Sequence, residues 1–239
     1  MNRRLAGIDL VVFDKDGTLI EFDAMWAGWS ADLVLSLERA SGIAIREPLY
    51  EMLGVDPSSG RVLPGGGLAA TPMARLRDLT RDLLVTAGLD GTEADAALDE
   101  AWLAPDPVAL ARPLADLPDL FAGLRRSGRR IAVATSDDRD PTERTLAALG
   151  LAELIDGVAC ADDGVAVKPA PDMVLRLCAQ LAIEPARTAV VGDSAADLAM
   201  GRSAGAGLVV GVLTGVGDTA HLEPLADLIV GSVADLGHD

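Results

Sequence analysis

The chain has 239 residues, of which 50% are hydrophobic, and its 37 acidic residues outnumber its 20 basic residues to give a formal net charge of −17. This apolar fraction excludes an intrinsically disordered acidic chain, so we expect a globular protein. The negative charge disfavours nucleic acid and anionic membrane surfaces as partners. No stretch approaches the roughly 20 apolar residues of a membrane-spanning helix.

The start of the chain and its cysteines indicate a compartment. Arg3 and Arg4 precede an apolar stretch, as in a signal peptide, but Asp9 interrupts that stretch and no small-residue cleavage site follows. Two cysteines, Cys160 and Cys178, are too few for a disulfide framework and fit a reducing environment. We therefore predict a cytoplasmic protein and leave its oligomeric state open.

Short apolar runs predict six β-strands. The first run is broken only by Asp9 and ends at an Asp-Lys-Asp-Gly-Thr turn, as expected of a buried strand. The predicted strands cover residues 8–13, 130–135, 155–160, 188–191, 207–212 and 228–230.

Helical patterns alternate with the strands in the second half of the chain. Asp140 is predicted to be an N-cap, with Pro141 in the first turn and Gly150 ending that helix. Pro171 begins another helix, and residues 194–203 form a third. This alternation predicts an α/β fold, with a Rossmann-like parallel sheet and helices on both faces.

The segment 21–111 interrupts the alternation, because it contains amphipathic helices and no convincing strand. We predict an α-helical domain of residues 21–111, inserted into an α/β core formed by residues 1–20 and 112–239. Trp26 and Trp29 either pack inside this domain or line a substrate cleft. The glycines at 65–67 belong either to a linker or to a loop that approaches the substrate.

Polar residues follow the predicted strands. Asp14 and Asp16 follow the first strand, Thr135 and Ser136 the second, and Asp193 the strand at 188–191. Because ligands bind beyond the carboxyl ends of the strands in open parallel sheets, we expect these residues at one edge of the sheet.

The chemistry of this set indicates a phosphoryl site. Several converging carboxylates need a counter-charge, and oxygen ligands without His or Cys favour a hard cation, of which Mg²⁺ best suits a phosphate site. Lys168, the lysine outside the Asp-Lys-Asp turn, offers a second positive charge. Thr135 offers a hydroxyl, and the amides of residues 136–138 an anion-binding nest. These groups together suit a phosphoryl group held for attack by a carboxylate.

The segment 13–19, Thr135, Lys168-Pro169 and the segment 192–197 resemble the four motifs of the haloacid dehalogenase-like hydrolase superfamily. The inserted helices resemble the cap domain of its phosphoglycolate phosphatase-like subgroup. The resemblance implies a Mg²⁺-dependent phosphatase that hydrolyses a small phosphate monoester through an aspartyl-phosphate intermediate.

The resemblance also implies residue roles. Asp14 would be the nucleophile, and Asp16 would protonate the leaving group, activate water and place its backbone carbonyl on the metal. Thr135 and Lys168 would hold the phosphoryl oxygens, and Asp193 would bind Mg²⁺. The remaining residues expected at the site are Gly17, Ser136 and Asp137 for the phosphate and Asp197 for the metal shell.

Plainer interpretations exist for several of these residues. An Asp-Gly pair after a strand is compatible with an ordinary turn. Ser194 and Asp197 fit an N-cap and its N3 partner, and Lys168 fits a solvated lysine. Residues 215–220 loosely match a dinucleotide-binding fingerprint, but too few residues follow, so we predict a turn there.

Other activities within and beyond the superfamily remain to be weighed. A dehalogenase would lack the second aspartate of the first motif, and a phosphonatase would need a lysine in the cap. The family's hexose-phosphate mutases place His and Lys beside the cap, and neither occurs between residues 20 and 167. We therefore favour hydrolysis, with a phosphomutase or phosphotransferase as the alternative and a receiver-like phosphorylation switch as the less favoured one. The particular ester stays open.

Overall fold

The computed structural model describes residues 3–63, 66–103 and 106–237. The chain divides into two compact units, a core unit made of Met1–Phe22 and Pro107–Asp239 and a helical unit made of Asp23–Asp106. Among the described residues, no helix combines the length and the apolar composition that a membrane span requires.

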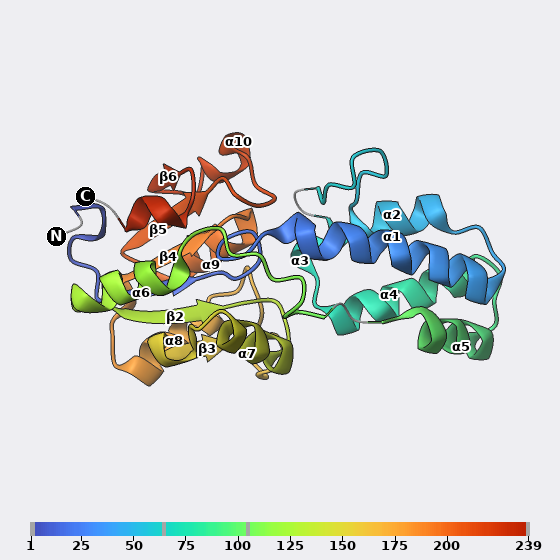
Figure 1. Cartoon of the computed structure of the whole chain (residues 1–239), viewed down its shortest axis with the longest axis horizontal. Coiled ribbons are helices and arrows are strands. Elements are labelled where there is room, and N and C mark those ends of the chain that lie inside the picture. Colours follow the sequence, from blue (N-terminus) through green and yellow to red (C-terminus); the bar gives the residue numbers. More distant parts are fainter. Residues whose placement is uncertain (1–2, 64–65, 104–105, 238–239) are drawn as a thin grey trace. The chain divides into compact units, whose positions relative to one another are not determined.

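The core unit is built on one parallel sheet with the strand order β3-β2-β1-β4-β5-β6 (Figure 1). Its strands are β1 (Leu10–Phe13), β2 (Arg130–Ala134), β3 (Gly157–Ala159), β4 (Thr188–Gly192), β5 (Leu208–Val212) and β6 (Leu228–Val230). This is the order of a doubly wound Rossmann sheet, in which the chain reverses its direction of winding beside β1. The predicted α/β class is therefore confirmed, and every strand lies within two residues of its predicted limits.

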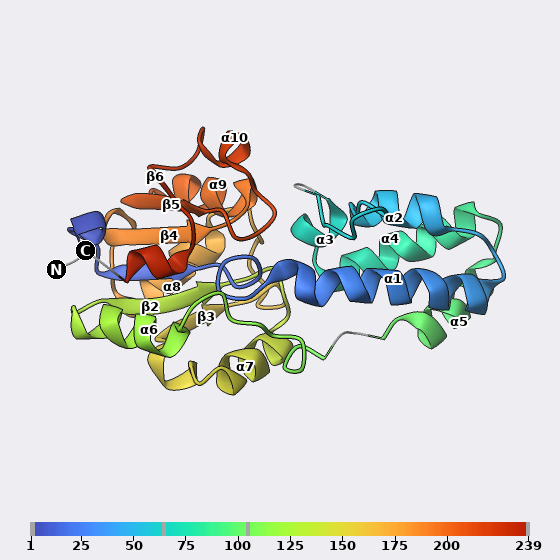
Figure 2. The same cartoon turned by 45° about the horizontal axis from the view of Figure 1, so that its top comes forward.

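Helices cover both faces of the sheet (Figure 2). Their bounds are α6 (Leu117–Arg126) and α7 (Arg139–Ala148) on one face, and α8 (Asp172–Leu181) and α9 (Ala195–Ala204) on the other. Along β1, Val11 and Phe13 face the first pair of helices while Leu10 and Val12 face the second. Because every residue of the strand is buried, its sequence is continuously apolar instead of alternating.

One predicted helix start is wrong and another is confirmed. Asp140 is not the N-cap of α7, because the helix begins at Arg139 after Asp138, whose side chain makes no capping hydrogen bond. Ser194 does cap α9, since its hydroxyl accepts a hydrogen bond from the Asp197 amide (3.2 Å) and the Asp197 side chain accepts from the Ser194 amide (3.0 Å).

The helical unit consists of helices, with the longest connection running from residue 54 to residue 66. Their bounds are α1 (Phe22–Ser41), α2 (Arg46–Leu53), α3 (Gly67–Ala70), α4 (Met73–Thr86) and α5 (Gly91–Ala101), and the core unit adds the short α10 (Thr219–Leu222). Single 3-10 turns occur at Arg3–Leu5, Ala152–Leu154, Pro185–Arg187 and Val233–Leu236.

Tryptophans form the centre of the helical unit. The ring of Trp29 contacts Trp26 and Trp102 edge to face, with centroid distances of 5.7 and 5.2 Å. Its indole N–H donates to the Leu103 carbonyl oxygen (2.7 Å). Edge-to-face rings and a satisfied indole are typical of packing, which supports that interpretation of Trp26 and Trp29.

The glycine-rich loop is described only in part, because residues 64 and 65 lie outside the described residues. Gly66 lies so close to Gly54 that a Cβ on either would overlap the other's backbone. A Cβ on Gly67 would overlap the Met52 carbonyl oxygen. Close packing on the end of α2 therefore requires these glycines, whatever else the loop contacts.

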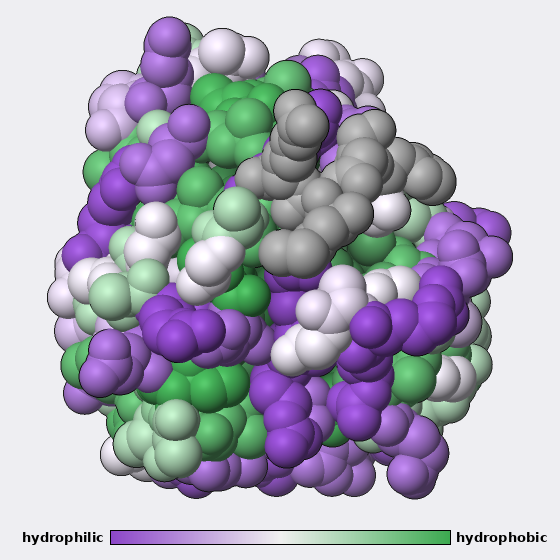
Figure 3. Space-filling model, turned by 90° about the vertical axis from the view of Figure 1, so that its left-hand side faces the viewer, coloured by the Kyte–Doolittle hydropathy of each residue, from purple (hydrophilic) through white to green (hydrophobic). Residues whose placement is uncertain are grey.

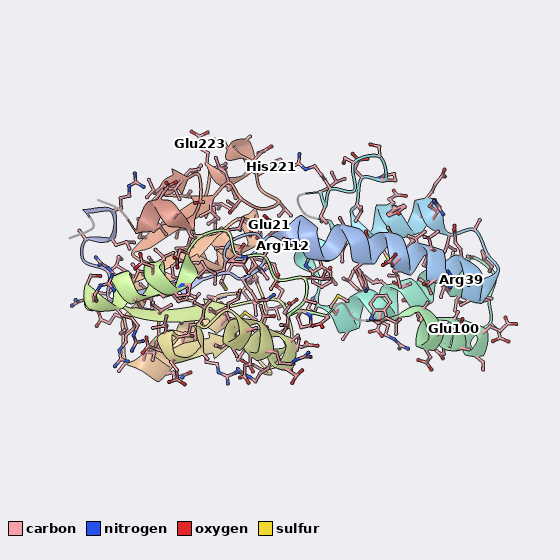
Figure 4. All side chains as sticks on the ribbon, viewed as in Figure 1. Glu21, Arg39, Glu100, Arg112, His221 and Glu223 are labelled. Atoms are coloured by element: carbon pink, nitrogen blue, oxygen red, sulfur yellow. The ribbon has the colours of Figure 1, made fainter. Side chains whose placement is uncertain are left out.

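The chain leaves and re-enters the core unit through paired segments. The Glu21 amide donates to the Arg112 carbonyl oxygen (2.9 Å), and Ile20 forms an antiparallel bridge with Pro113. Figure 4 shows Glu21 and Arg112 beside each other at this place.

On the part of the core unit that faces the viewer in Figure 3, hydrophilic and hydrophobic side chains are intermixed.

Candidate active site

Three neighbouring strands end at the same place. Phe13, the last residue of β1, lies in register with Val133 on β2 and Val191 on β4. The next residues along these strands lead to Asp14, Thr135 and Asp193, respectively. The strand order therefore brings together residues that are far apart in the sequence, at the reversal point where ligands bind in such sheets.

Lys168 joins two of the predicted aspartates. Its ammonium lies 2.5 Å from Oδ1 of Asp14 and 2.6 Å from Oδ1 of Asp197, and only 4% of its side chain is exposed. Burial by itself would lower the pKa of Lys168, but the charges of Asp14 and Asp197 outweigh it and the pKa lies above its ordinary value. Lys168 is thus an ion-paired lysine of the site and not a solvated one.

Asp197 serves as both a helix cap and a charge partner. Its Oδ2 accepts from the Ser194 amide and hydroxyl (3.0 and 2.5 Å), while Oδ1 faces Lys168. A Cβ on Gly192 would overlap the Asp197 side chain. Glycine at the end of β4 therefore allows Asp197 to approach the sheet.

Asp193 is enclosed by a loop that the sequence analysis treated as a turn. Its Oδ2 accepts from the Val216 amide (2.8 Å) and its Oδ1 from the Thr18 hydroxyl (3.2 Å). A Cβ on Gly215 would overlap its carboxylate, and one on Gly217 would overlap its backbone oxygen. The two glycines of the loose fingerprint are therefore explained by close approach to Asp193, a role that the sequence analysis missed.

Asp14, Asp193 and Asp197 form a cluster suited to a cation. Their carboxylate oxygens lie within 4.8 Å of one another, and all three residues are buried. Among the described residues only Lys168 forms ion pairs with this cluster, and none of its ion pairs involves Asp193. Three carboxylates and one ammonium leave two negative charges unbalanced, the charge of one divalent cation. The donors are all oxygen atoms, as Mg²⁺ prefers.

The excess of negative charge in this cluster is accompanied by raised pKa values of its carboxyl groups. Burial raises the pKa of Asp14 to about 6, although the Lys168 charge opposes the shift. Burial and the charges of Asp14 and Asp197 raise the pKa of Asp193 well above its usual value. A bound cation would favour the ionised carboxylates and so lower these pKa values.

A second ion-paired group lies beside the first. Asp16 makes no part of the three-aspartate cluster; both of its carboxylate oxygens lie near the Lys15 ammonium, at 2.7 and 2.8 Å. The same ammonium lies 2.9 Å from Oδ2 of Asp137. Burial raises the pKa of Asp16 to about 7, against the opposing charge of Lys15. The sequence analysis gave Lys15 no role, although its place between two aspartates was a signal.

The loop after β2 has the features of an anion-binding nest. The buried Thr135 hydroxyl accepts from the Asp137 amide (3.1 Å), which leaves its own hydrogen available to a ligand. The Ser136 amide has no hydrogen-bond partner in the described part of the chain. These residues directly precede α7, and amides at a helix N-terminus favour anions.

Gly17 shapes the turn after β1. Its amide already donates to the Ile20 carbonyl oxygen (2.7 Å), and its own carbonyl oxygen accepts from the Thr214 hydroxyl (2.7 Å). Its φ of +83° and its approach to Asp193, where a Cβ would clash, both require glycine. The Gly17 amide is thus hydrogen-bonded within the turn, and the predicted role of Gly17 in phosphate binding stays a prediction.

Replacing Gly215 with alanine should displace Asp193 and weaken metal binding. We expect the apparent Mg²⁺ affinity to fall roughly 10- to 100-fold, as it does when groups that orient ligands are disturbed. Titration of Mg²⁺ by isothermal calorimetry measures this. Gly28→Ala is the matched control, because a Cβ there meets nothing within 4 Å. Unchanged affinity in Gly215→Ala would contradict the role given to the loop.

The pKa values also predict how metal-free stability depends on pH. Asp14 and Asp16 have folded pKa values of about 6 and about 7, above their ordinary value of 3.8. Their contribution to stability is complete below the unfolded pKa and is lost as the pH rises through the folded values. Asp156 and Asp163, whose pKa values are lowered, act in the opposite sense, but only as the pH falls below the ordinary value.

We therefore expect the urea midpoint of the protein in EDTA to fall between about pH 4 and pH 7. The fall should be smaller in Asp16→Asn, which removes one of the groups with a raised pKa. A midpoint that rises across this window in the unmodified protein would contradict the prediction.

A Rossmann-like sheet whose central strands are followed by buried aspartates, with a helical unit inserted after β1, defines an α/β protein with a buried acidic site. The family model for haloacid dehalogenase-like hydrolases matches residues 8–205, and the chain belongs to this family.

Curated relatives agree with this class. The chain is 32% identical over 197 residues to N-acetylmuramic acid 6-phosphate phosphatase of Pseudomonas aeruginosa, covering 82% of this chain and 77% of that one. It is 30% identical over 205 residues to phosphoglycolate phosphatase of Rhodospirillum rubrum, covering 84% and 78%. A solved structure of a predicted phosphoglycolate phosphatase from Haemophilus somnus matches with a TM-score of 0.63 at 21% identity, covering 97% of each chain. The phosphoglycolate phosphatase-like subgroup and the phosphoric monoester hydrolase class are confirmed.

A mutase is also among the relatives. The chain is 32% identical over 136 residues to β-phosphoglucomutase of Mycobacterium bovis, covering 51% of each chain. Both the predicted activity and the predicted alternative thus have relatives, and the phosphatases cover more of the chain.

Proposed function

We propose that this phosphatase hydrolyses a small phosphate monoester, with Mg²⁺ as its cofactor and Asp14 as the nucleophile that forms an aspartyl phosphate. The observation that carries the proposal is the position of Asp14. It directly follows β1, a central strand of the sheet, belongs to the three-aspartate cluster, and has one carboxylate oxygen held by Lys168. The nest at Thr135 and Ser136 follows the neighbouring strand.

The first half of the reaction is phosphoryl transfer to the chain. A carboxylate oxygen of Asp14 attacks phosphorus while the bond from phosphorus to the ester oxygen breaks. Asp16 gives its proton to the departing oxygen, and its pKa of about 7 allows the protonated form near neutral pH. Lys168 and Thr135 stabilise charge on the phosphoryl oxygens.

The second half regenerates the enzyme. Asp16, now a carboxylate, takes a proton from water as the water oxygen attacks phosphorus and the bond to Asp14 breaks. Inorganic phosphate leaves, and Asp16 is again protonated. One residue thus serves as acid and then as base, as the reversal of the step requires.

The Mg²⁺ ion would be held by the carboxylates of Asp14 and Asp193 and the backbone carbonyl of Asp16, with Asp197 supporting the metal shell. The fit rests on the all-oxygen donors and the two unbalanced negative charges of the cluster. When bound, the ion supplies neutralisation of the negative charge on the phosphoryl group.

Substrate and setting are proposed at the level of class. The two phosphatase relatives are named for different phosphate esters, which supports a small phosphomonoester without selecting one. We assign the helical unit, predicted as residues 21–111, the role of a cap that excludes water during the reaction. Cys160 and Cys178 are buried free thiols, which supports the predicted cytoplasmic location.

The test is turnover of p-nitrophenyl phosphate with Mg²⁺ and with excess EDTA. The proposal predicts many turnovers with Mg²⁺ and none with EDTA. Failure of every phosphomonoester in a panel of sugar phosphates, phosphoglycolate and nucleotides would overturn it. One stable phosphoryl group per chain without turnover would instead indicate a phosphorylation switch.

The mutase alternative rests on the β-phosphoglucomutase relative and on the shared aspartyl-phosphate chemistry. Against it, the chain has no His or Lys between residues 20 and 167. Phosphorus NMR of the products separates the two, since a phosphatase yields inorganic phosphate and a mutase yields an isomeric sugar phosphate.

A further inference from the structure

The Lys15 ammonium lies at a junction between two loops of the core unit. It contacts both carboxylate oxygens of Asp16, in the turn after β1, and one oxygen of Asp137, in the loop after β2. Only 1% of the Lys15 side chain is exposed. A buried ammonium with three carboxylate oxygens around it fixes the geometry of both loops.

The two lysines of the chain pair with different aspartates of the site. Lys168 pairs with Asp14 and Asp197, while Lys15 pairs with Asp16 and Asp137. The Lys15 ammonium lies within 2.9 Å of an oxygen of each of its two partners. Lys168 thus pairs with Asp14, the proposed nucleophile, and Lys15 pairs with Asp16, the proposed acid and base. Lys15 makes no ion pair with Asp14 among the described residues.

We propose that Lys15 is a positioning residue, which holds the Asp16 carboxyl at the site by tying it to Asp137. The inference rests on the proposed function, in which Asp16 protonates the leaving group. Lys15 needs no contact with the substrate. A carboxyl group that accepts hydrogen bonds from an ammonium anchored to a second loop loses rotational freedom, and proton transfer depends on that placement.

Comparing kcat/KM for substrates whose leaving groups differ in basicity tests this role of Lys15. An alkyl phosphate needs its leaving oxygen protonated, whereas 2,4-dinitrophenyl phosphate releases a stable anion that needs little help. We expect Lys15→Met to lower kcat/KM for the alkyl phosphate roughly 10- to 100-fold, the usual range for removing a group that orients another. The activated ester should change far less. A purely structural role would lower both values equally.

A double-substitution cycle tests whether Lys15 acts through Asp16. In an Asp16→Asn background, adding Lys15→Met should cause no further selective loss on the alkyl phosphate, because the group being positioned is already gone. The control is Arg130→Met, which removes a mostly exposed ion-paired cation at the start of β2 and should leave both kcat/KM values unchanged.

Circular dichroism establishes that each variant is folded. If Lys15→Met does not fold, Asp137→Ala decides, because it keeps both Lys15 and Asp16 and removes the second carboxylate that anchors the ammonium. A selective loss on the alkyl phosphate supports the proposal. An equal loss on both esters, or an additive effect in the Asp16→Asn background, overturns it. If Asp16→Asn itself shows no selectivity, the assigned role of Asp16 in the proposed function fails, and the Lys15 role falls with it; selectivity in Asp16→Asn alone rejects only the Lys15 role.

Discussion

Asp14→Asn lowers kcat by roughly 10⁴-fold or more, because it removes the atom that forms the covalent bond to phosphorus. The side chain of Asn has nearly the same shape as that of Asp, and its oxygen can still accept a hydrogen bond from Lys168. It also removes one buried negative charge from a cluster whose carboxylates repel one another. The variant should therefore fold, and its melting temperature in EDTA should be no lower than that of the unmodified protein.

Steady-state turnover of p-nitrophenyl phosphate with Mg²⁺ measures the loss. Asp9→Asn is the matched control, since Asp9 precedes the same strand but pairs with Arg187 away from the site. It should keep nearly full activity. Residual activity above about a hundredth of normal in Asp14→Asn would reject Asp14 as the nucleophile, because nucleophile removal ordinarily has a much larger effect.

Asp193→Asn should abolish the effect of Mg²⁺ on both activity and stability. Asp193 lies in the cluster without an ion-pair partner in the described part of the chain, so it depends most on a bound cation for its counter-charge. Loss of the metal should lower kcat/KM by about 10²-fold or more, since charge stabilisation by a metal is worth several kcal/mol. A ligand that binds only the folded state raises the melting temperature, so this rise should disappear as well.

Differential scanning fluorimetry with and without Mg²⁺ provides the readout independent of activity. In EDTA at pH 7.5, Asp193→Asn should melt at a higher temperature than the unmodified protein, because a buried carboxylate with a raised pKa has been removed. Asp218→Asn, at an exposed helix cap, should keep the Mg²⁺ response. A full Mg²⁺-induced shift in Asp193→Asn would contradict the assigned metal site.

The fold was predictable from the sequence because each strand is a short apolar run bounded by a turn, and the central strand β1 is fully buried. Asp14 and Thr135 could be placed at one edge for the same reason, since parallel strands present their carboxyl ends together. The start of α7 was not predictable with certainty, because Asp138 and Asp140 are both good N-cap residues. Local preference favoured Asp140, the residue before Pro141, but the loop after β2 is shorter than predicted and the helix begins at Arg139.

The roles of Lys15 and Gly215 depend on contacts that sequence spacing does not reveal. Lys15 meets Asp137 only because β1 and β2 are adjacent in the sheet, and Gly215 meets Asp193 only because the loop after β5 returns to the end of β4. The sequence marked both positions as unusual, one by the rarity of lysine and the other by paired glycines. Their partners required the tertiary structure.

The net charge of −17 is compatible with an anionic substrate, because the charge at the site differs from that of the whole chain. Both lysines of the chain are buried there, where they pair with the aspartates of the site. At physiological salt the Debye length is about 8 Å, so distant surface acids contribute little to the potential in the site.

The central claim is that phosphate passes through a covalent bond to Asp14. Acid quenching during turnover, followed by borohydride reduction, converts a phosphorylated aspartate to homoserine, which peptide mass spectrometry locates. The account predicts homoserine at position 14 in the unmodified protein with substrate and Mg²⁺, and none in Asp14→Asn. Homoserine at Asp16 or Asp193, or turnover in which no aspartate is ever converted, would contradict it.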